Sequence, residues 1–473
     1  MDWRVKLKRE DSEITVEEVE KIVEGIIEKR TEDLMGVSFP CVCGRTHGVP
    51  MKHLSVKMSA LDCVADILSK LGIGGTGKLV YDRKIEEKVA LPIEEGLEKQ
   101  GLKLIPYTVG DDGDEIKPEV SLSEEIARQL RGSCDFLISC GSGVITDLTK
   151  QAANILDIPY AIIATAPSMN GYTSSMAALT DRGIKKTLLV RPAEAIFADI
   201  GVLMNAPLPM VRAGLGDIVS KSVCNADWKL SQIVKKTYFC PVPFRITDRS
   251  EPLYLETAEE IGLRTGRGIE MLTDGIMRSG LSMTIVGTST PSSGAEHFIS
   301  HYWDLMALLH GEKKYLHGVQ VGVATLIVLR LYDFIRELRI REKVNMERLK
   351  KAYPSKDDIK RRIASKFGAC AEGVEDEFMK KYQPWDEKKQ EIEWIIENWD
   401  GIWKELEPFI RPSAPVKRAL RVSGAAANYR DLGKRREDVV DALYNAWYIR
   451  GRYTILDLIV ELGLLEEALE IID

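Results

Sequence analysis

The sequence predicts an α/β domain followed by an all-α domain. Between Gly36 and Val202, short apolar runs bounded by Gly, Asp or Pro alternate with amphipathic stretches. Such alternation is typical of a mainly parallel sheet with helices on its faces. After about Pro207 the strand signals fade and long helical stretches follow. The length of 473 residues exceeds what one ordinary core holds, so two or three domains are expected.

The predicted elements begin with an N-terminal arm. In DSEITVEEVEKIVEGIIEKR, isoleucine and valine recur at helical spacing, and Thr15 is suited to cap the resulting helix. The expected divisions of the chain are a helical arm over residues 1–35, the α/β domain over residues 36–206 and the all-helical domain over residues 207–473.

Within the α/β domain, strands are expected in KLVYD, KLIPYTV, CDFLISC and PYAIIATA. Helices are expected in SLSEEIARQLR and VITDLTKQAANIL, with a further helical segment, IEEKVALPIEEGLEKQ, interrupted near Pro92. In the all-helical domain the expected helical stretches are Asp217–Leu230, Glu256–Ser279, Ala295–Leu309, Gly318–Leu338, Asp386–Leu406 and a last pair near Glu437–Leu465.

The composition argues against a nucleic-acid-binding, membrane-spanning or secreted protein. Acidic residues (72) slightly outnumber basic ones (65), and no long Lys/Arg cluster occurs, so nothing favours nucleic acid as a partner. No apolar run approaches the roughly 20 residues that span a bilayer, and the first residues lack the apolar stretch of a signal peptide. The 8 cysteines are scattered, which indicates reduced thiols. We therefore expect a cytoplasmic protein without a membrane span.

A glycine-rich turn stands in FLISCGSGVITDLTK. A predicted strand ends at Cys140, a Gly-Ser-Gly turn follows, and a helix starts near Val144. Glycines allow close backbone approach, and a helix N-terminus offers free N–H groups, which together suit a pyrophosphate. The spacing departs from GxGxxG, and an ordinary strand–turn–helix connection is the alternative.

The end of the strand in VYDRK carries two residues with opposite implications. Asp82 can accept hydrogen bonds from the ribose hydroxyls of an adenine dinucleotide and would disfavour a 2′-phosphate. Arg83 could do the reverse, so the choice between NAD and NADP stays open. A turn residue that ends the strand is the alternative for Asp82.

Histidines cluster between Gly294 and Gly322. His297 and His301 are four residues apart and share one helix face, His310 faces elsewhere, and His317 follows a break. A pair on one helix and a third histidine on the next element could converge on a catalytic zinc ion, with a carboxylate completing the set. The alternative is a group of ordinary helix-surface or core histidines.

The segment RAGLGDIVSKSVCNADWKL offers that carboxylate. Asp217 is expected to begin a helix directly after Gly214 and Gly216, which let the helix end come close to another group. Lys221 lies on the same face. Helix capping by Asp217 and an ion pair with Lys221 form the alternative.

A second histidine-bearing stretch, FPCVCGRTHGVPMKH, places Cys41 and Cys43 before His47 and His53. Structural zinc sites usually separate their paired cysteines by two to four residues, and only one residue intervenes here. A turn before a strand is therefore the preferred interpretation.

Several of these stretches occur together in a fixed order: GSGVITDLTK, IATAPSMNGYTSSMAALT, GIKKTLLVRPAEAIFADIGVLMNAP, GLGDIVSK, EHFISHYWD, LHGVQVGV and IRGRYTILDLIVELGLLE. In this combination the chain resembles the bacterial branch of the sn-glycerol-1-phosphate dehydrogenases, the metal-dependent group within the iron-containing alcohol dehydrogenase and dehydroquinate synthase-like superfamily. The resemblance covers about Phe39 to Leu465. It implies a dehydroquinate synthase-like fold, with an α/β nucleotide-binding domain and an all-α domain that binds metal and substrate.

The resemblance also implies roles by position. Asp217, His297 and His317 match the metal ligands, and His301 matches a substrate-contacting histidine that could relay a proton. Asn170 stands where the family usually has a substrate-contacting Asp, so an amide replaces a possible base. Lys221 stands where iron-dependent relatives have a fourth ligand, which favours zinc, or nickel, over iron. The cofactor-binding residues expected with Asp82 are Gly141, Gly143, Val144, Ile145, Thr146, Asp147, Thr165, Ala166, Pro167, Ser168 and Ser174.

The implied reaction is the reversible reduction of dihydroxyacetone phosphate to sn-glycerol 1-phosphate by NAD(H) or NADP(H), in phospholipid biosynthesis. Asp217 and His301 would be catalytic, and Asn170, Asp217, Lys221 and His301 would contact the small phosphorylated substrate, with Lys221 on its phosphate. A homo-oligomer is expected, its size left open. The alternatives are a sugar-phosphate cyclase like dehydroquinate synthase, another polyol dehydrogenase of the superfamily, and a binding protein without turnover.

Overall fold

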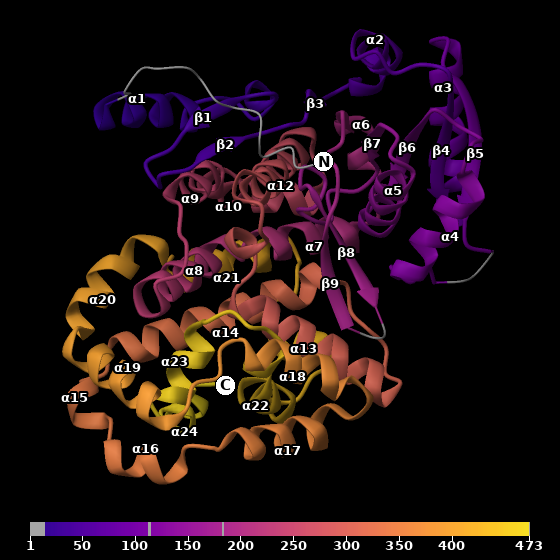
Figure 1. Ribbon diagram of the computed structural model, residues 1–473. Helices are drawn as coiled ribbons and strands as arrows, with labels where there is room; N and C mark the ends of the chain where they lie inside the picture. The colour runs from indigo at the N-terminus through magenta and orange to yellow at the C-terminus, as the bar shows by residue number, and fades with distance from the viewer. Residues whose placement is uncertain (1–14, 112–114, 182–183, 473) are drawn as a thin grey trace.

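A parallel sheet organises the N-terminal part of the chain. Figure 1 shows the computed structural model, which describes residues 15–111, 115–181 and 184–472. Six strands pair in the order β3-β10-β7-β6-β4-β5, and every pairing is parallel. Their bounds are β3 His53–Lys57, β4 Thr76–Asp82, β5 Lys103–Val109, β6 Phe136–Gly141, β7 Tyr160–Ala164 and β10 Ala195–Asp199. The predicted parallel sheet is confirmed.

The central strands are buried because helices cover the sheet. Every residue of β6, β7 and β10 is buried, as expected where a parallel sheet is covered on both faces. The helices of this part are α2 Val64–Lys70, α3 Leu91–Lys99, α4 Val120–Leu130, α5 Gly143–Leu156 and α6 Ile200–Met204. The helices predicted before and after β6 are α4 and α5, and Pro92 lies in the first turn of α3.

The order of the strands creates a crevice. From β4 the chain passes outward to β5 and then returns to β6 on the other side of β4. At such a reversal the connections leave in opposite directions, and a crevice opens outside the carboxyl ends of the two strands. The turn after β6 and the end of β4 therefore lie at the position where α/β sheets bind nucleotides.

Two hairpins were not predicted. Strands β1 (Ser38–Pro40) and β2 (Thr46–Gly48) pair antiparallel, as do β8 (Met176–Asp181) and β9 (Ile184–Leu189). In Figure 1 the β8–β9 hairpin extends from the sheet toward the lower, helical part. There Arg450 donates a hydrogen bond to the carbonyl oxygen of Lys185 at 3.0 Å.

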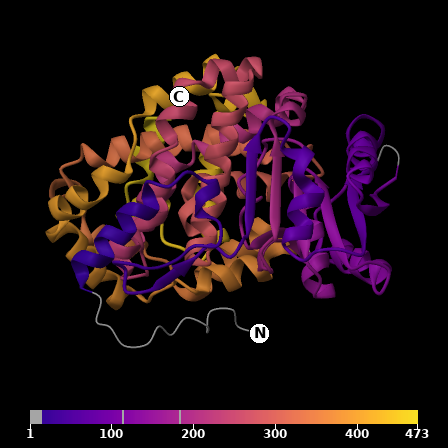
Figure 2. The same cartoon turned by 90° about the horizontal axis from the view of Figure 1, so that it is seen from above.

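Helices make up the rest of the chain. Among the described residues from 207 onward the secondary structure is helical, as predicted. The bounds are α7 Leu208–Ile218, α8 Lys221–Lys235, α9 Pro241–Asp248, α10 Glu251–Glu256, α11 Ala258–Leu263, α12 Gly266–Val286, α13 Ala295–His310, α14 His317–Arg336, α15 Ile340–Lys343, α16 Met346–Ala352, α17 Lys356–Phe367, α18 Ala371–Met379, α19 Trp385–Glu397, α20 Trp399–Leu406, α21 Ser413–Val422, α22 Arg436–Asn445, α23 Ile455–Glu461 and α24 Leu465–Glu470. Figure 2 shows this part beside the sheet. The domain boundaries stay a prediction.

Several predicted helical stretches divide. The stretch Asp217–Leu230 is wrong as one helix, because α7 ends at Ile218 and α8 begins at Lys221. Asp217 therefore lies in the last turn of α7 and does not begin a helix. The hydroxyl of Ser220 donates to the carbonyl oxygen of Asp217 at 2.7 Å, which satisfies an acceptor at the helix end. The stretches at Glu256–Ser279 and Asp386–Leu406 divide as well, whereas α13 and α14 match their predictions to within about two residues.

Helix α14 is long and apolar. By length and composition it could cross a membrane, but 78% of its most apolar window is buried inside the protein. It packs against α7 and α13. These contacts are those of a core helix.

The N-terminal helix α1 (Val16–Ile27) confirms the predicted cap. Thr15 and Glu18 form a capping box, with each side chain bonded to the backbone of the other residue. Helix α1 contacts β1 and α9, and Glu24 pairs with Arg245 of α9 at 2.7 Å. The arm and the first hairpin thus lie against the helical part, at the upper left of Figure 1.

Candidate metal centre and dinucleotide-binding crevice

Three of the predicted ligands meet. Asp217 at the end of α7, His297 in the first turn of α13 and His317 at the start of α14 place their ligand atoms within 4.8 Å of one another. The Nε2 atom of His297 lies 3.5 Å from a carboxylate oxygen of Asp217. The rings of His297 and His317 have centroids 5.1 Å apart. One carboxylate and two imidazoles form the donor set of a catalytic zinc site with an open position.

Glycines allow the helices to approach closely. A Cβ on Gly216 would lie 2.2 Å from the carbonyl oxygen of Gly318, and a Cβ on Gly318 would lie 1.9 Å from that of Ala213. Helices α7 and α14 can therefore cross at backbone distance only because both positions lack a side chain. This crossing brings Asp217 to His317, as the glycines before Asp217 suggested.

Hydrogen bonds orient the ligands. The Nδ1 atom of His297 lies 2.7 Å from Glu296, whose carboxylate also accepts from the backbone N–H of Gly294. Because a carboxylate only accepts, His297 donates from Nδ1 and directs Nε2 toward Asp217. His317 has Ser300 at 3.2 Å from its Nδ1, which can orient its ring in the same way.

Asp217 has the free acceptor that a metal ion needs. Its Oδ2 accepts from the backbone N–H of Asn170 at 3.1 Å, whereas its buried Oδ1 has no hydrogen-bond partner. A second possible set, His301, Asp304 and His317, is also compact. In that set Asp304 already accepts from Gln320 at 2.7 Å. The orphaned oxygen therefore favours the set with Asp217.

Burial and neighbouring charges determine the protonation states. Burial opposes ionisation of Asp217, but the contact with the His297 ring and the nearby positive charge of Lys221 outweigh it and lower the pKa of the Asp217 carboxyl to about 2. Burial, assisted by the charge of Lys185, holds the pKa values of His301 and His317 well below their ordinary range. An ionised carboxylate and a neutral imidazole are the forms that bind a metal ion.

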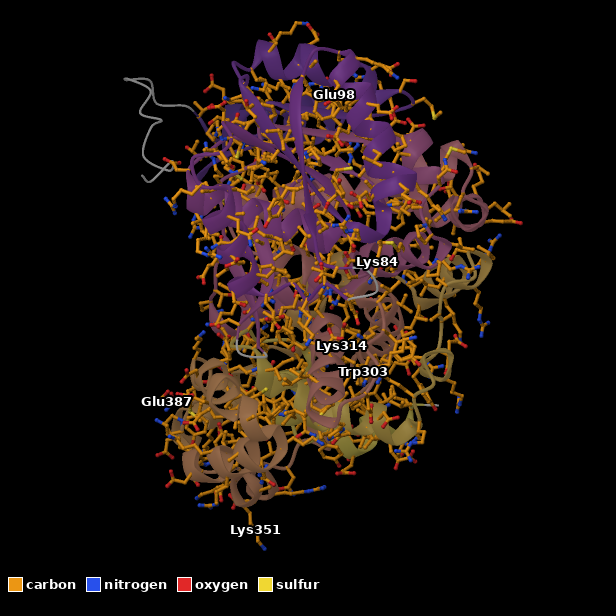
Figure 3. The ribbon with its side chains drawn as sticks, turned by 90° about the vertical axis from the view of Figure 1, so that its right-hand side faces the viewer. Lys84, Glu98, Trp303, Lys314, Lys351 and Glu387 are labelled. Atoms are coloured by element: carbon orange, nitrogen blue, oxygen red, sulfur yellow. The ribbon has the colours of Figure 1, made fainter. Side chains whose placement is uncertain are left out.

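His301 lies beside this cluster and opens on a small basic cavity. Its ring stacks on that of His317 at 5.1 Å, and its buried Nδ1 has no hydrogen-bond partner. The cavity, of about 80 Å³, is also lined by Lys185, Arg450 and Lys314. Lys314, in the connection between α13 and α14, is labelled in Figure 3. Such cations suit an anionic group.

Lys185 and Arg450 had no predicted role. They belong to the stretches GIKKTLLV and IRGRY, which the resemblance includes, but nothing local distinguishes them from surface cations. Their meeting depends on the β8–β9 hairpin. Lys221, the predicted phosphate contact, is 2% exposed, with Ser220 at 3.3 Å from its ammonium, and does not line this cavity.

The predicted cofactor-binding turn lies in the crevice. Asp82 ends β4, Gly141 ends the neighbouring β6, and Thr165 directly follows β7. Because these strands are parallel, their carboxyl ends meet at one edge of the sheet. A Cβ on Gly141 would lie 2.6 Å from the Cβ of Ile145, so glycine allows the tight turn into α5. The N-cap Ser142 leaves the first amides of α5 without a side-chain cap.

Other predicted cofactor contacts have buried side chains. Ile145, Thr146, Asp147 and Ser174 are less than one-tenth exposed. Asp147 accepts from the backbone N–H of Ala178 at 3.1 Å. Their side chains therefore pack inside the protein, whereas Gly143, Val144 and Ser168 are partly exposed.

Lys150, a buried lysine to which the sequence analysis gave no role, holds the loop after β7 against α5. Lys150 of α5 donates to the carbonyl oxygens of Gly171 at 2.5 Å and of Ser174 and Met176 at 3.0 Å each. Its position at the end of VITDLTK was visible, but an amphipathic helix gives no sign that a lysine points inward. The loop after β7 is thus tied to α5.

That loop joins the crevice to the metal centre. Its residue Asn170 donates its backbone N–H to Asp217. A Cβ on Gly214 would lie 1.7 Å from the carbonyl oxygen of Pro167, so α7 also reaches this loop at backbone distance. The predicted residues Thr165, Ala166, Pro167 and Ser168 consequently lie between the carboxyl end of β7 and the candidate ligand Asp217.

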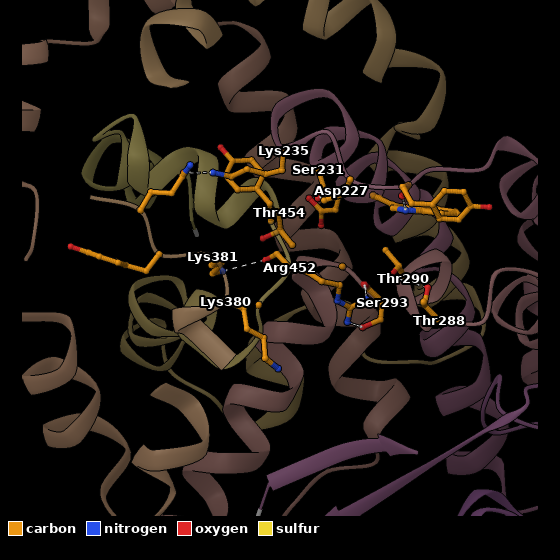
Figure 4. A pocket seen from close by; sticks show the side chains of 18 residues that line it. Asp227, Ser231, Lys235, Thr288, Thr290, Ser293, Lys380, Lys381, Arg452 and Thr454 are labelled. Atoms are coloured by element: carbon orange, nitrogen blue, oxygen red, sulfur yellow. Dashed lines mark hydrogen bonds between the residues drawn. The ribbon is translucent and has the colours of Figure 1, made fainter. Parts of the chain in front are cut away.

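A larger cavity, of about 490 Å³, is lined by none of the three candidate ligands and is shown in Figure 4. Its charged groups already have protein partners. Arg452 donates to the backbone and side-chain oxygens of Ser293, and Lys381 to the carbonyl oxygens of Trp447 and Arg452. Asp227 accepts three hydrogen bonds. This cavity offers no counterpart to the orphaned oxygen of Asp217.

Comparisons with known proteins find alcohol and glycerol-1-phosphate dehydrogenases. The sequence model described as iron-containing alcohol dehydrogenase matches residues 55–207. The chain is 30% identical over 368 residues to a glycerol-1-phosphate dehydrogenase [NAD(P)+] from Geobacillus stearothermophilus, covering 72% of this chain and 89% of the relative. It is 31% identical over 372 residues to the protein of that name from Halalkalibacterium halodurans, covering 73% and 92%.

Solved structures show the same fold at low identity. A probable glycerol dehydrogenase from Sinorhizobium meliloti 1021 aligns with a TM-score of 0.56 and 16% identity over 88% of this chain and 97% of that chain. A 1,3-propanediol oxidoreductase aligns with a TM-score of 0.56 and 15% identity, over 89% and 98%. The expected combination of a parallel α/β part and a helical part is thereby confirmed.

Proposed function

This chain belongs to the glycerol-1-phosphate dehydrogenase family, and we propose from this premise that it interconverts dihydroxyacetone phosphate and sn-glycerol 1-phosphate with NAD(H) or NADP(H) and a divalent metal ion. The observation that carries the proposal is the convergence of Asp217, His297 and His317 beside the dinucleotide crevice. A basic cavity at His301 supplies a place for the phosphate.

The donor set supports zinc as the metal. Asp217, His297 and His317 would hold it with one position left open, and Lys221, which cannot ligate a metal, stands where a fourth ligand would be. Nickel accepts the same ligands. When bound, the metal supplies Lewis-acid polarisation of the C2 carbonyl and the nicotinamide supplies the hydride.

The side chains of the protein orient the reactants. The turn Gly141–Gly143 and the loop Thr165–Ser168 would hold the dinucleotide, with Asp82 at the ribose. Lys185 and Arg450 would bind the phosphate in the cavity that His301 also lines. We assign the phosphate to these residues in preference to Lys221, whose ammonium is already within reach of Ser220 and Cys224.

His301 is the proposed proton relay. Its pKa is held well below the ordinary range, chiefly by burial, so the ring is neutral and can pass a proton. Its Nδ1 has no protein partner. Asn170 cannot take this role, because an amide neither donates nor accepts a proton in this range. Its backbone N–H instead holds the carboxylate of Asp217.

The test is oxidation of NADH and of NADPH with dihydroxyacetone phosphate, run with a panel of divalent metals and followed by chiral analysis of the product. We expect metal-dependent consumption of the reduced cofactor and formation of sn-glycerol 1-phosphate. A cofactor that is regenerated in each cycle would identify a cyclase and contradict the proposal.

Two ligand variants complete this test. Asp217→Ala and His297→Ala should abolish metal-dependent turnover while NADH binding persists, because the glycine turn proposed to bind the dinucleotide belongs to β6 and α5, whereas the two substituted residues belong to α7 and α13. Full activity of either variant after metal removal would contradict the assignment. Sedimentation of the purified protein would test the expected homo-oligomer.

A further inference from the structure

A second cluster of metal-binding side chains lies far from the first. Cys41, Cys43 and His47 belong to the β1–β2 hairpin, and Cys240 is the N-cap residue of α9. The ligand atoms of these four residues lie within 4.8 Å of one another. In Figure 1 the hairpin lies above α9 and α12, on the far side of α12 from α13 and α14.

We propose that Cys41, Cys43, His47 and Cys240 form a structural zinc site. The sulfur atoms of Cys41 and Cys240 are 3.5 Å apart, and Nε2 of His47 lies 3.2 Å from the sulfur of Cys43 and 3.4 Å from that of Cys240. With Zn–S of about 2.3 Å and Zn–N of about 2.0–2.1 Å, the edges of a tetrahedral site measure roughly 3.5–3.8 Å. The donor atoms already stand near these separations.

The hydrogen bond of His47 prepares it as a ligand. Its Nδ1 lies 2.8 Å from the carbonyl oxygen of Ile285, at the end of α12. Because a carbonyl oxygen only accepts, Nδ1 carries the proton and the lone pair of Nε2 in the neutral ring points at the sulfur atoms. A backbone carbonyl on the remote nitrogen is the usual partner of a metal-binding histidine.

The turn that contains the two hairpin cysteines, over residues 41–45, explains how their unusual spacing suits a shared ion. Gly44 has a φ of +80° and donates its N–H to the carbonyl oxygen of Cys41 at 2.9 Å, and Cys41 donates to that of Arg45 at 3.0 Å. This tight turn lets sulfur atoms with one residue between them face the same point. The turn expected before β2 is thus present, and the spacing that argued against zinc is offset by a fourth ligand nearly two hundred residues away.

The surroundings suit a site with three thiolates. Such a zinc site carries a net negative charge, and hydrogen bonds to its sulfur atoms stabilise it. The hydroxyl of Tyr238 lies 3.2 Å from the sulfur of Cys43, and the guanidinium of Arg45 lies 3.5 Å above the Tyr238 ring. Cys41, His47 and Cys240 are buried, whereas Cys43 is partly exposed.

Four protein ligands leave no position for a substrate, so the role is structural. The site would join the hairpin that follows the N-terminal arm to α9 and to the end of α12. All 8 cysteines of the chain are free, so no disulfide makes this connection. A Cys41–Cys240 disulfide is the competing chemistry, and it would require the two sulfur atoms to close to about 2.05 Å.

The experiment measures zinc in the full-length protein purified without chelators. In the Asp217→Ala/His297→Ala variant, which lacks the first metal centre, about one zinc per chain should remain. Cys240→Ser in that background should lose it, and the matched control Cys63→Ser, at a cysteine outside the cluster, should keep it. Retention of zinc by Cys240→Ser, or absence of zinc from its parent, would overturn the proposal.

A second measurement needs no cysteine variant and covers the case in which Cys240→Ser does not fold. The Asp217→Ala/His297→Ala protein is loaded with cobalt, and thiolate-to-cobalt charge transfer with the visible bands of a tetrahedral ion is expected. A spectrum without thiolate charge transfer would refute the site, as would mass-spectrometric detection of a Cys41–Cys240 disulfide in freshly purified protein. Either result would leave the proposed dehydrogenase activity untouched.

Discussion

The crossing of α7 and α14 should control the spacing of the proposed metal ligands Asp217 and His317, and Gly216→Ala tests this. Asp217 follows Gly216 at the end of α7, and His317 begins α14 beside Gly318. A Cβ on residue 216 would lie 2.2 Å from the carbonyl oxygen of Gly318, about 1 Å inside ordinary contact. Because the opposing atom belongs to the backbone, only a movement of the helices can relieve the clash.

The expected consequences affect both stability and chemistry. Overpacking of this kind lowers the free energy of unfolding by about 1–3 kcal/mol. A shift of about 1 Å at a reacting centre can reduce turnover by about 100-fold. We therefore expect kcat/KM of Gly216→Ala to fall by about that factor and its zinc affinity to fall with it. Urea unfolding, calorimetric zinc titration and NADH oxidation measure the three quantities.

Gly96→Ala is the matched control. Gly96 lies within α3, and no atom stands within 4 Å of the position that its Cβ would take. Zinc affinity and kcat/KM should be unchanged, and stability should rise by about 0.5–1 kcal/mol. Zinc affinity at the level of the unmodified protein in Gly216→Ala would refute the view that the glycine contact spaces the ligands.

Four further substitutions test neighbouring contacts. Asp227 accepts a hydrogen bond from the backbone N–H of Ala295, the first residue of the helix that carries His297. Asp227→Asn should therefore weaken zinc binding and lower the free energy of unfolding by about 1–3 kcal/mol in urea titrations. Unchanged stability would contradict this. Lys185→Met should raise KM for dihydroxyacetone phosphate more than for dihydroxyacetone, whereas Lys221→Met should raise both alike; a phosphate-specific effect of Lys221→Met would restore the sequence-based assignment. Lys150→Met should raise KM for NADH, because the loop after β7 loses its donor; an unchanged KM would separate that loop from cofactor binding.

Local patterns predicted the elements whose environment is uniform. Strands β4, β6 and β7 are apolar runs in the covered part of the sheet, and α13 and α14 are long periodic helices. Their burial follows from their own residues, so the sequence suffices. The end of α7 was not predicted, because it depends on a contact that its local sequence pattern does not reveal. No glycine or proline stands at positions 219 and 220, and the break depends on the hydroxyl of Ser220 at the carbonyl oxygen of Asp217.

Residues that act only through distant partners could not be predicted. In the sequence, Lys185 and Arg450 cannot be distinguished from surface cations. In the structure, the β8–β9 hairpin lies near Arg450, and both residues line the cavity at His301. Cys240 has no nearby cysteine or histidine, so its relation to Cys41 and Cys43 appears only in three dimensions. In each case the chemistry of the residue was visible, but its neighbours were not.

Each of the three candidate ligands has a positioning residue beside it in the sequence. Asp217 follows Gly216, and His317 precedes Gly318, and these two glycines make the helix crossing possible. His297 follows Glu296, whose carboxylate directs its ring. A histidine or aspartate next to a glycine or carboxylate that can position it is a stronger indication of a metal site than a histidine or aspartate alone. By the same reasoning, the Cys43–Gly44 pair, with its left-handed glycine, marks the hairpin as a built turn.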